Sequence, residues 1–210
     1  QTEKSPANVY VMMPSCVPAT HVDDNGGIFS ANDMYPYVRN PRVLGLGEVM
    51  DDPGVINGDE SMFSKLLLFE NRTIDGHAPY LPNRELSAYK MAGVDTDHEA
   101  TSFEYALEEV RRGIHVHIRE GSAAHNLKDI VEGIVRRNRY GIFFLLYGRQ
   151  AYRGYFTGRP YQLQRKACGF PRHESGSGDQ NGDDQHCKML RLKASGRDFS
   201  GLPGGLCCAG

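Results

Sequence analysis

The sequence predicts an α/β protein made of consecutive βα units, which would form an arc of a parallel barrel. Short apolar runs alternate with longer amphipathic segments over residues 9–138, a pattern typical of βα repeats and a parallel sheet. Only five strand-like runs occur in this region, too few to close a barrel of about eight strands.

The expected strands are short apolar runs, each followed by a longer segment. In chain order they are Val9 to Met13, Arg42 to Leu46, Thr73 to Asp75, Val94 to Asp97 and Ile114 to Ile118. Helices are expected where apolar residues recur with a helical period. These are Ser61 to Glu70, Leu86 to Met91, Thr101 to Gly113 and Leu127 to Val135. Thr101 and Glu104 have the spacing of a capping box, and Gly113 is a stop signal.

Composition favours a small-molecule substrate. The chain has 210 residues, 40% of them hydrophobic, and a net charge of −2, so it lacks the basic field that drives binding to a nucleic acid polymer. No apolar run reaches the roughly 20 residues needed to cross a membrane, and the first residues are polar. We therefore expect a cytoplasmic protein without a membrane partner. Because Gln1 is not an initiator Met, we expect the chain to begin within a longer reading frame.

Three polar clusters follow expected strands, and each offers a carboxylate or an imidazole. They contain Glu48, His77 and His98. The C-terminal ends of successive parallel strands converge on one face, so these residues are candidate metal ligands. Two imidazoles and a carboxylate suit a divalent first-row ion, which can lower the pKa of bound water to about 7. The alternative is two separate structural histidines and a Glu48 paired with an arginine.

Other polar residues carry weaker signals. His115 and His117 form a His-x-His pair, but they lie in the middle of an expected strand, so we interpret them as sheet residues. The segment Arg119 to Ser122 follows the same strand. Arg119 is a candidate anion donor and Glu120 a candidate proton carrier, although an ion pair with Ser122 as a helix cap would look the same.

The loop of residues 14–20 follows the first expected strand and is rigid and polar. It could contact substrate, or its two prolines could shape an ordinary turn. No activating base is evident near Cys16, which argues against a nucleophilic cysteine.

Five motifs together resemble the bacterial adenine deaminase family of the amidohydrolase superfamily. They are PSCVPAT at 14–20, GLGEVM at 45–50, IDGHAP at 74–79, AGVDTDHEAT at 92–101 and IREGSAAHNL at 118–127. The resemblance covers residues 8–144. It implies about strands 3 to 7 of a metal-dependent (β/α)8 barrel, and a purine-catabolic hydrolase that converts adenine to hypoxanthine and ammonia. A binuclear manganese or iron centre is implied, as is a homo-oligomer for the intact enzyme.

The resemblance also implies roles for individual residues. Glu48 matches a carboxylate that bridges two metal ions, and His77 and His98 match metal ligands on the next two strands. Catalytic roles are implied for Glu99 and Glu120, with a carboxylate moving a proton to the leaving ammonia. Substrate contacts are implied for Arg119, Ser122 and Ser15.

The C-terminal part departs from the family. Residues 145–210 hold half of the 24 glycines and four of the five cysteines, and we expect a disordered tail after a partial barrel domain at 1–144. The family's Thr-Asp-Asp-Arg run is absent, but codons for Tyr147 to Ala151 can encode it when read one nucleotide later. We therefore predict a frameshift near Phe143 to Leu146, which would make the spacing of the tail's cysteines accidental.

Two family features are missing from the chain as read, the upstream His-x-His motif and the downstream aspartate. We therefore expect the isolated chain to be inactive. Two other hypotheses remain open. One is an amidohydrolase that acts on a cyclic amide or another nucleobase, because loops set the substrate. The other is a non-catalytic remnant.

Overall fold

A computed structural model describes residues 9–120, 124–137, 143–147 and 207–209. These residues form seven strands in one sheet, in the order β6-β5-β4-β3-β2-β1-β7. Their bounds are β1 Val9–Pro14, β2 Val43–Val49, β3 Thr73–Gly76, β4 Thr96–Asp97, β5 His115–Glu120, β6 Phe143–Tyr147 and β7 Cys207–Ala209. Every pairing is parallel. The protein is therefore an α/β protein with a parallel sheet, as predicted, and the arc is compatible with part of a barrel.

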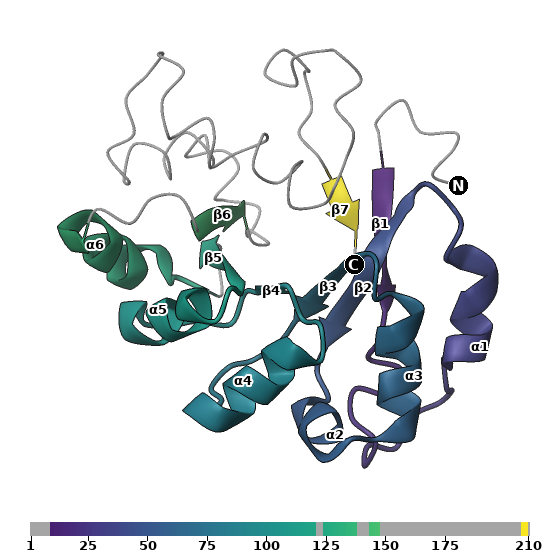
Figure 1. The fold of residues 1–210 in the computed structure, drawn as a ribbon. Coiled ribbons are helices and arrows are strands. Elements are labelled where there is room, and N and C mark those ends of the chain that lie inside the picture. Colours follow the sequence, from purple (N-terminus) through teal and green to yellow (C-terminus); the bar gives the residue numbers. More distant parts are fainter. Residues whose placement is uncertain (1–8, 121–123, 138–142, 148–206, 210) are drawn as a thin grey trace.

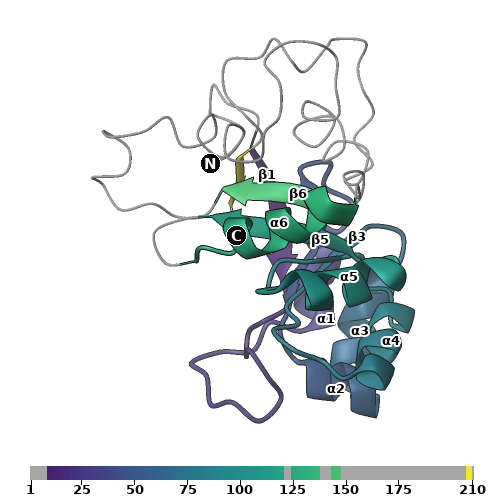
Figure 2. The ribbon, with the colours of Figure 1, turned by 90° about the vertical axis from the view of Figure 1, so that its left-hand side faces the viewer.

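Helices connect the strands and gather on one side of the curved sheet (Figure 1). They are α1 Ala31–Met34, η2 Tyr35–Tyr37 (a 3-10 turn), α2 Asp52–Asn57, α3 Glu60–Leu68, α4 Asn83–Met91, α5 Phe103–Arg111 and α6 Leu127–Arg137. A view turned by 90° shows α1 to α4 stacked near one another, with α5 and α6 beside β5 and β6 (Figure 2). None of the helices in the described ranges is long and apolar enough to span a membrane.

All five predicted strands are present, with shifted ends. β2 runs on to Val49, so Glu48 is the penultimate residue of the strand. β4 is shorter than predicted and consists of Thr96–Asp97 alone. Each shift leaves the polar cluster at the C-terminal end of its strand, where the sequence placed it.

The helix caps correct one expectation and explain one helix that the sequence did not predict. α5 is capped by Ser102, whose side chain accepts a hydrogen bond from the Tyr105 amide, so the predicted cap at Thr101 is wrong by one residue. Helix α2 was not predicted because its six residues are too few to show a helical period. It begins at the Asp51 cap and ends at Gly58, whose φ of 78° is the left-handed conformation that glycine adopts easily.

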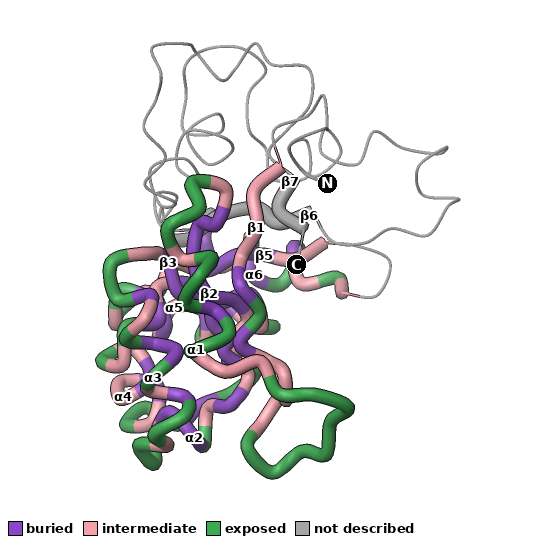
Figure 3. The backbone as a smooth tube through the Cα atoms, turned by 90° about the vertical axis from the view of Figure 1, so that its right-hand side faces the viewer, coloured by how far each residue is buried: buried purple, intermediate pink, exposed green. Residues whose placement is uncertain are grey.

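Buried side chains form two clusters between the helices and the sheet. The larger cluster packs beneath α1 to α4 and includes Met34, Leu66 and Tyr89. The smaller one lies between α5, α6 and β5 and includes Phe103 and Ile130. Figure 3 shows mostly buried positions along β2, mostly intermediate positions along β1, and many exposed positions along the loops.

Strands β2 and β3 approach closely because one position has no side chain. A Cβ atom at Gly45 would lie 1.8 Å from the Thr73 carbonyl oxygen. Gly45 is paired with Thr73 in the parallel register, so any larger residue there would push the two strands apart. This close contact lies between the first half of β2 and the start of β3, the two strands that lead to Glu48 and His77.

The predicted disordered tail falls mostly outside the described residues. Residues 148–206 and 210 are not described, so the predicted domain boundary near residue 144 remains a prediction. Two short segments were not expected from the sequence. Phe143–Tyr147 is strand β6 beside β5, and Cys207–Ala209 is strand β7 beside β1.

Candidate metal centre

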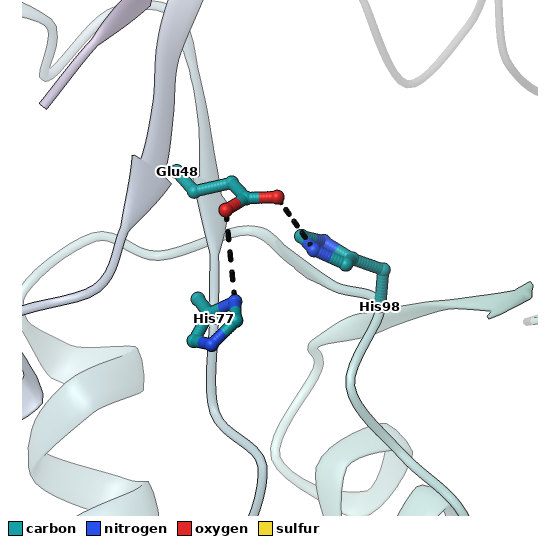
Figure 4. A group of neighbouring side chains, drawn as sticks. All are labelled: Glu48, His77 and His98. Carbon is teal, nitrogen blue, oxygen red and sulfur yellow. Dashed lines mark ion pairs between the residues drawn. The ribbon is translucent and has the colours of Figure 1, made fainter. Parts of the chain in front are cut away.

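Three neighbouring strands bring the candidate ligands together. Glu48 lies near the end of β2, His77 directly follows β3, and His98 directly follows β4. These strands are adjacent in the sheet and run in the same direction. Figure 4 shows the Glu48 carboxylate between the two imidazoles. The convergence expected from the order of the motifs is therefore present in the structure.

The geometry is that of a possible cation site. Glu48 Oε1 lies 2.8 Å from His98 Nε2, and Glu48 Oε2 lies 3.6 Å from His77 Nδ1. One potential ligand atom from each of the three residues lies within 4.8 Å of the others. The side chain of His98 is 8% exposed and that of Glu48 is 39% exposed. Solvent therefore reaches the group from the Glu48 side, whereas His98 is buried. A carboxylate and two imidazoles in this arrangement fit a divalent ion.

A further carboxylate supports His98 from behind. Asp75 Oδ2 lies 3.6 Å from His98 Nδ1, the ring nitrogen that faces away from Glu48. The Thr96 hydroxyl donates to the other oxygen of Asp75. A carboxylate behind a ligating imidazole is a recurrent feature of metal sites, because it fixes the orientation of the ring. Asp75 lies within the IDGHAP motif, but no local pattern distinguishes it as a partner of His98.

The electrostatics favour positive charge at this place. Burial alone would lower the pKa of His98, but its hydrogen bonds to Asp75 and Glu48 outweigh burial and raise the pKa to about 10. The hydrogen bond to His98 also lowers the pKa of Glu48. A cation at the His98 ring nitrogen, either a proton or a metal ion, is therefore stabilised by two carboxylates.

Glu99 and Arg119, two further predicted site residues, contact each other beside the imidazoles. Arg119 donates two hydrogen bonds to the Glu99 carboxylate, 2.5 Å and 2.7 Å long. Glu99 Oε1 also lies 3.4 Å from His77 Nδ1 and 3.6 Å from His98 Nε2. The structure thus brings Glu99 and Arg119 to the candidate centre, while their chemical roles stay predictions.

The remaining predicted residues lie farther from the imidazoles or outside the described ranges. Glu120 Oε1 lies 3.0 Å from His125 Nδ1, and its Oε2 accepts from the Leu127 amide at the start of α6. Ser15 is fully buried, and its hydroxyl donates to the main-chain carbonyl of Glu48. Ser122 falls outside the described residues.

The His-x-His pair on β5 is separate from the candidate ligand group within the described ranges. His117 nevertheless acts on the centre indirectly. Burial raises the pKa of Asp75, but the hydrogen bond to His98 and the nearby His117 lower it by more. Through His117, strand β5 therefore helps to keep Asp75, the carboxylate behind His98, in its charged form.

Two buried residues that the sequence analysis did not single out hold the loops around the site. The Tyr89 hydroxyl accepts a hydrogen bond of 3.0 Å from the His77 amide. The Asp97 carboxylate accepts hydrogen bonds of 2.6 Å from the Ala78 amide and from the Glu99 amide. Tyr89 has the apolar spacing of an ordinary core residue, so its pattern gave no functional signal. Asp97 directly precedes the candidate ligand His98 in the AGVDTDHEAT motif, and this position was the only feature of the sequence that pointed to a role at the site.

Together, the fold and this group of side chains define a parallel α/β protein with a candidate divalent-metal centre at the C-terminal ends of its strands. Curated relatives make the description more specific. The chain is 58% identical over 138 residues to an adenine deaminase from Desulfitobacterium hafniense, which covers 66% of this chain and 24% of that protein. It is 46% identical over 140 residues to adenine deaminase 2 from Carboxydothermus hydrogenoformans, covering 67% and 25%.

A third relative, the adenine deaminase of Kosmotoga olearia, is 44% identical over 140 residues. The matched part of the chain is therefore homologous to adenine deaminases, which confirms the resemblance seen in the motifs. The chain spans about a quarter of the length of the curated relatives it matches. No family model matches the chain.

Proposed function

We propose that the enzyme to which this segment belongs hydrolyses adenine to hypoxanthine and ammonia, and that Glu48, His77 and His98 hold a divalent metal ion. The observation that carries the proposal is the convergence of these three side chains in a segment homologous to adenine deaminases. In this reaction water adds to the purine carbon that bears the amino group, the C–N bond breaks, and ammonia leaves. No oxidant or reductant is needed.

Each residue of the candidate centre would have its own role in holding the metal. Glu48 would bridge two ions in the complete enzyme, with manganese or iron as the expected metal, and the histidines would each supply one nitrogen. Bound metal supplies a water of lowered pKa. Asp75 orients the His98 ring through its Nδ1 atom.

Glu99 is the best-placed proton carrier among the predicted catalytic residues. Its Oε1 atom lies within 3.6 Å of both imidazoles, while Glu120 contacts His125 and Leu127. Arg119 donates to both oxygens of Glu99 and so fixes the orientation of the Glu99 carboxylate. We propose that Glu99 passes a proton to the leaving nitrogen and that Arg119 orients it. The substrate contact predicted for Ser15 is not part of this proposal, because Ser15 is fully buried and its hydroxyl donates to the Glu48 carbonyl. The substrate contact predicted for Ser122 stays a prediction, because Ser122 lies outside the described residues.

Metal binding by the 210-residue chain tests the first part of the proposal. We expect Co²⁺ to bind in a 1:1 ratio by isothermal titration calorimetry, and His77→Ala or His98→Ala to weaken binding at least tenfold. His115→Ala is the matched control, because it removes an imidazole outside the candidate ligand group. Equal binding by all variants would refute the assignment of the ligands.

Activity is tested in a chimera, because the isolated chain is expected to be inactive. Residues 9–120 would replace the matching segment of the Desulfitobacterium hafniense adenine deaminase. We expect the chimera to release ammonia from adenine, and Glu48→Gln to abolish the release. Activity on a cyclic amide or another nucleobase instead would favour the alternative amidohydrolase, and no activity with any substrate would favour a non-catalytic remnant. The cytoplasmic location and the homo-oligomeric state of the intact enzyme remain predictions.

A further inference from the structure

A single buried hydroxyl group connects the backbones of two strand ends that carry candidate ligands. Tyr89 lies on α4 and is fully buried. Its hydroxyl donates to the main-chain carbonyl of Val49 at 2.5 Å and accepts from the main-chain amide of His77 at 3.0 Å. Val49 is the residue after Glu48, so one phenol group joins the end of β2 to the start of the loop after β3.

This bridge acts on the backbone rather than on the ligand side chains. The His77 amide belongs to a candidate ligand, and the Val49 carbonyl belongs to the neighbour of another. On the other side, the Ser15 hydroxyl donates to the carbonyl of Glu48 itself. The two successive carbonyls at the end of β2 are therefore both held by buried hydroxyl groups, one from the loop after β1 and one from α4.

The phenol is suited to a permanent structural contact. Burial holds the pKa of Tyr89 well above its usual value, so the hydroxyl keeps its proton and can donate throughout the neutral range. Its donor and one acceptor position are both used, and the ring is packed in the larger core cluster. A buried side chain with a locked ring transmits the position of α4 to the two strand ends.

We infer that Tyr89 is a positioning residue that places His77 relative to Glu48 and His98, an assignment that rests on the proposed metal-binding function. His77 Nδ1 lies 3.6 Å from Glu48 Oε2, and the His77 and His98 rings have centroids 5.7 Å apart. His77 follows the last residue of β3, where sheet hydrogen bonds end, so the phenol takes over the restraint that the sheet no longer provides.

The test uses Tyr89→Phe, which removes one oxygen and keeps the ring. The matched control is Tyr105→Phe. The Tyr105 hydroxyl also bridges two main-chain groups near the site, donating to the Ala78 carbonyl and accepting from the Leu81 amide. Ala78 follows His77 as Val49 follows Glu48, so both hydroxyls contact the neighbour of a candidate ligand, but only Tyr89 contacts a main-chain group of a ligand residue itself. Both variants therefore lose the same number of hydrogen bonds, and only one loses contact with a ligand residue.

Two measurements on the full 210-residue chain separate positioning from general stability. The first is Co²⁺ affinity by calorimetry, which we expect to fall about tenfold in Tyr89→Phe and to stay within twofold of the wild type in Tyr105→Phe. The second is the nuclear Overhauser effect between the His77 and His98 rings without metal. We expect it to weaken in Tyr89→Phe and to persist in Tyr105→Phe.

The outcomes are distinguishable. If the wild-type chain does not bind Co²⁺, the proposed metal site is wrong, and the ring-to-ring signal alone decides whether Tyr89 positions His77. If Tyr89→Phe keeps both the affinity and the ring-to-ring signal, the inference is overturned. Equal losses in the two variants would also overturn it, because they would show that only stability had changed.

Discussion

Arg119 holds the Glu99 carboxylate with a two-pronged contact, in which Nη1 donates to Oε1 at 2.5 Å and Nη2 donates to Oε2 at 2.7 Å. Neither side chain is well solvated, since Glu99 is 13% exposed and Arg119 is 25% exposed. Removing one partner therefore leaves a charge with little water around it.

This contact predicts a coupled effect on stability. Arg119→Gln is expected to lower the free energy of unfolding by about 1–3 kcal/mol. Adding Glu99→Gln should recover part of the loss, because the unpaired carboxylate is then neutral. Urea denaturation of the two single variants and the double variant measures the coupling. Strictly additive losses would contradict the prediction. Arg111→Gln, at an exposed pair with Glu108, is the control and should have little effect.

The raised pKa of His98 predicts how stability depends on pH without metal. The folded-state pKa is about 10 and the ordinary value is 6.5, so the folded chain binds this proton more tightly than the unfolded chain. The contribution is complete below pH 6.5 and is lost as the pH rises toward 10. Urea unfolding in a chelating buffer at several pH values should show this decline, and His98→Gln should flatten it. An unchanged slope in the variant would exclude His98 as its source.

The buried acid Glu109 predicts that neutralising one side chain increases stability. Glu109 on α5 is fully buried, and burial together with the nearby Asp97 raises its pKa to about 10. Between its ordinary value of 4.5 and about 10, the folded chain keeps a proton that the unfolded chain releases, so stability falls as the pH rises.

Glu109→Gln has nearly the same shape and cannot ionise. We expect it to stabilise the chain at pH 8 by more than about 1 kcal/mol, and by less at pH 5. Thermal or urea unfolding at the two pH values measures the difference. The prediction fails if the variant is destabilised equally at both.

The close approach of β2 and β3 predicts a strong effect of one methyl group. Gly45→Ala would place a carbon 1.8 Å from the Thr73 carbonyl oxygen, and a backbone atom in a sheet cannot easily move away. We expect a loss of about 1–3 kcal/mol in the free energy of unfolding and weaker Co²⁺ binding, because the two strands that lead to Glu48 and His77 would separate. Gly27→Ala is the control, since nothing lies within 4 Å of its added carbon, and it should behave like the wild type.

The frameshift hypothesis predicts the result of sequencing the gene again. The matches to curated adenine deaminases span 62–69% of the chain, and the motifs that carry the resemblance all lie within residues 14–127. We expect a single-nucleotide shift near the codons for Phe143 to Leu146. Restoring the frame should produce Thr-Asp-Asp-Arg in place of the residues that follow. An unshifted gene with the same sequence in close relatives would refute the hypothesis.

The sequence was most informative where local pattern and tertiary structure agree. Alternating apolar runs and helical periods predicted the five strands β1 to β5 and the helices α3 to α6, because each buries one continuous face. It was less informative for short elements. Helix α2 depends on the Asp51 cap and Gly58 and is too short to show a helical period, and of the strand predicted at Val94 to Asp97 only Thr96–Asp97 is in β4.

Local sequence pattern was enough to predict the fold class, the family resemblance, and the residues that stand at the strand ends. Glu48, His77 and His98 could be named because a parallel sheet brings the ends of successive strands to one face. The groups that support these residues could be identified only in the folded chain. Asp75 behind His98, Arg119 on Glu99 and Tyr89 beneath His77 are contacts between residues distant in sequence, and such contacts depend on packing that no local pattern records.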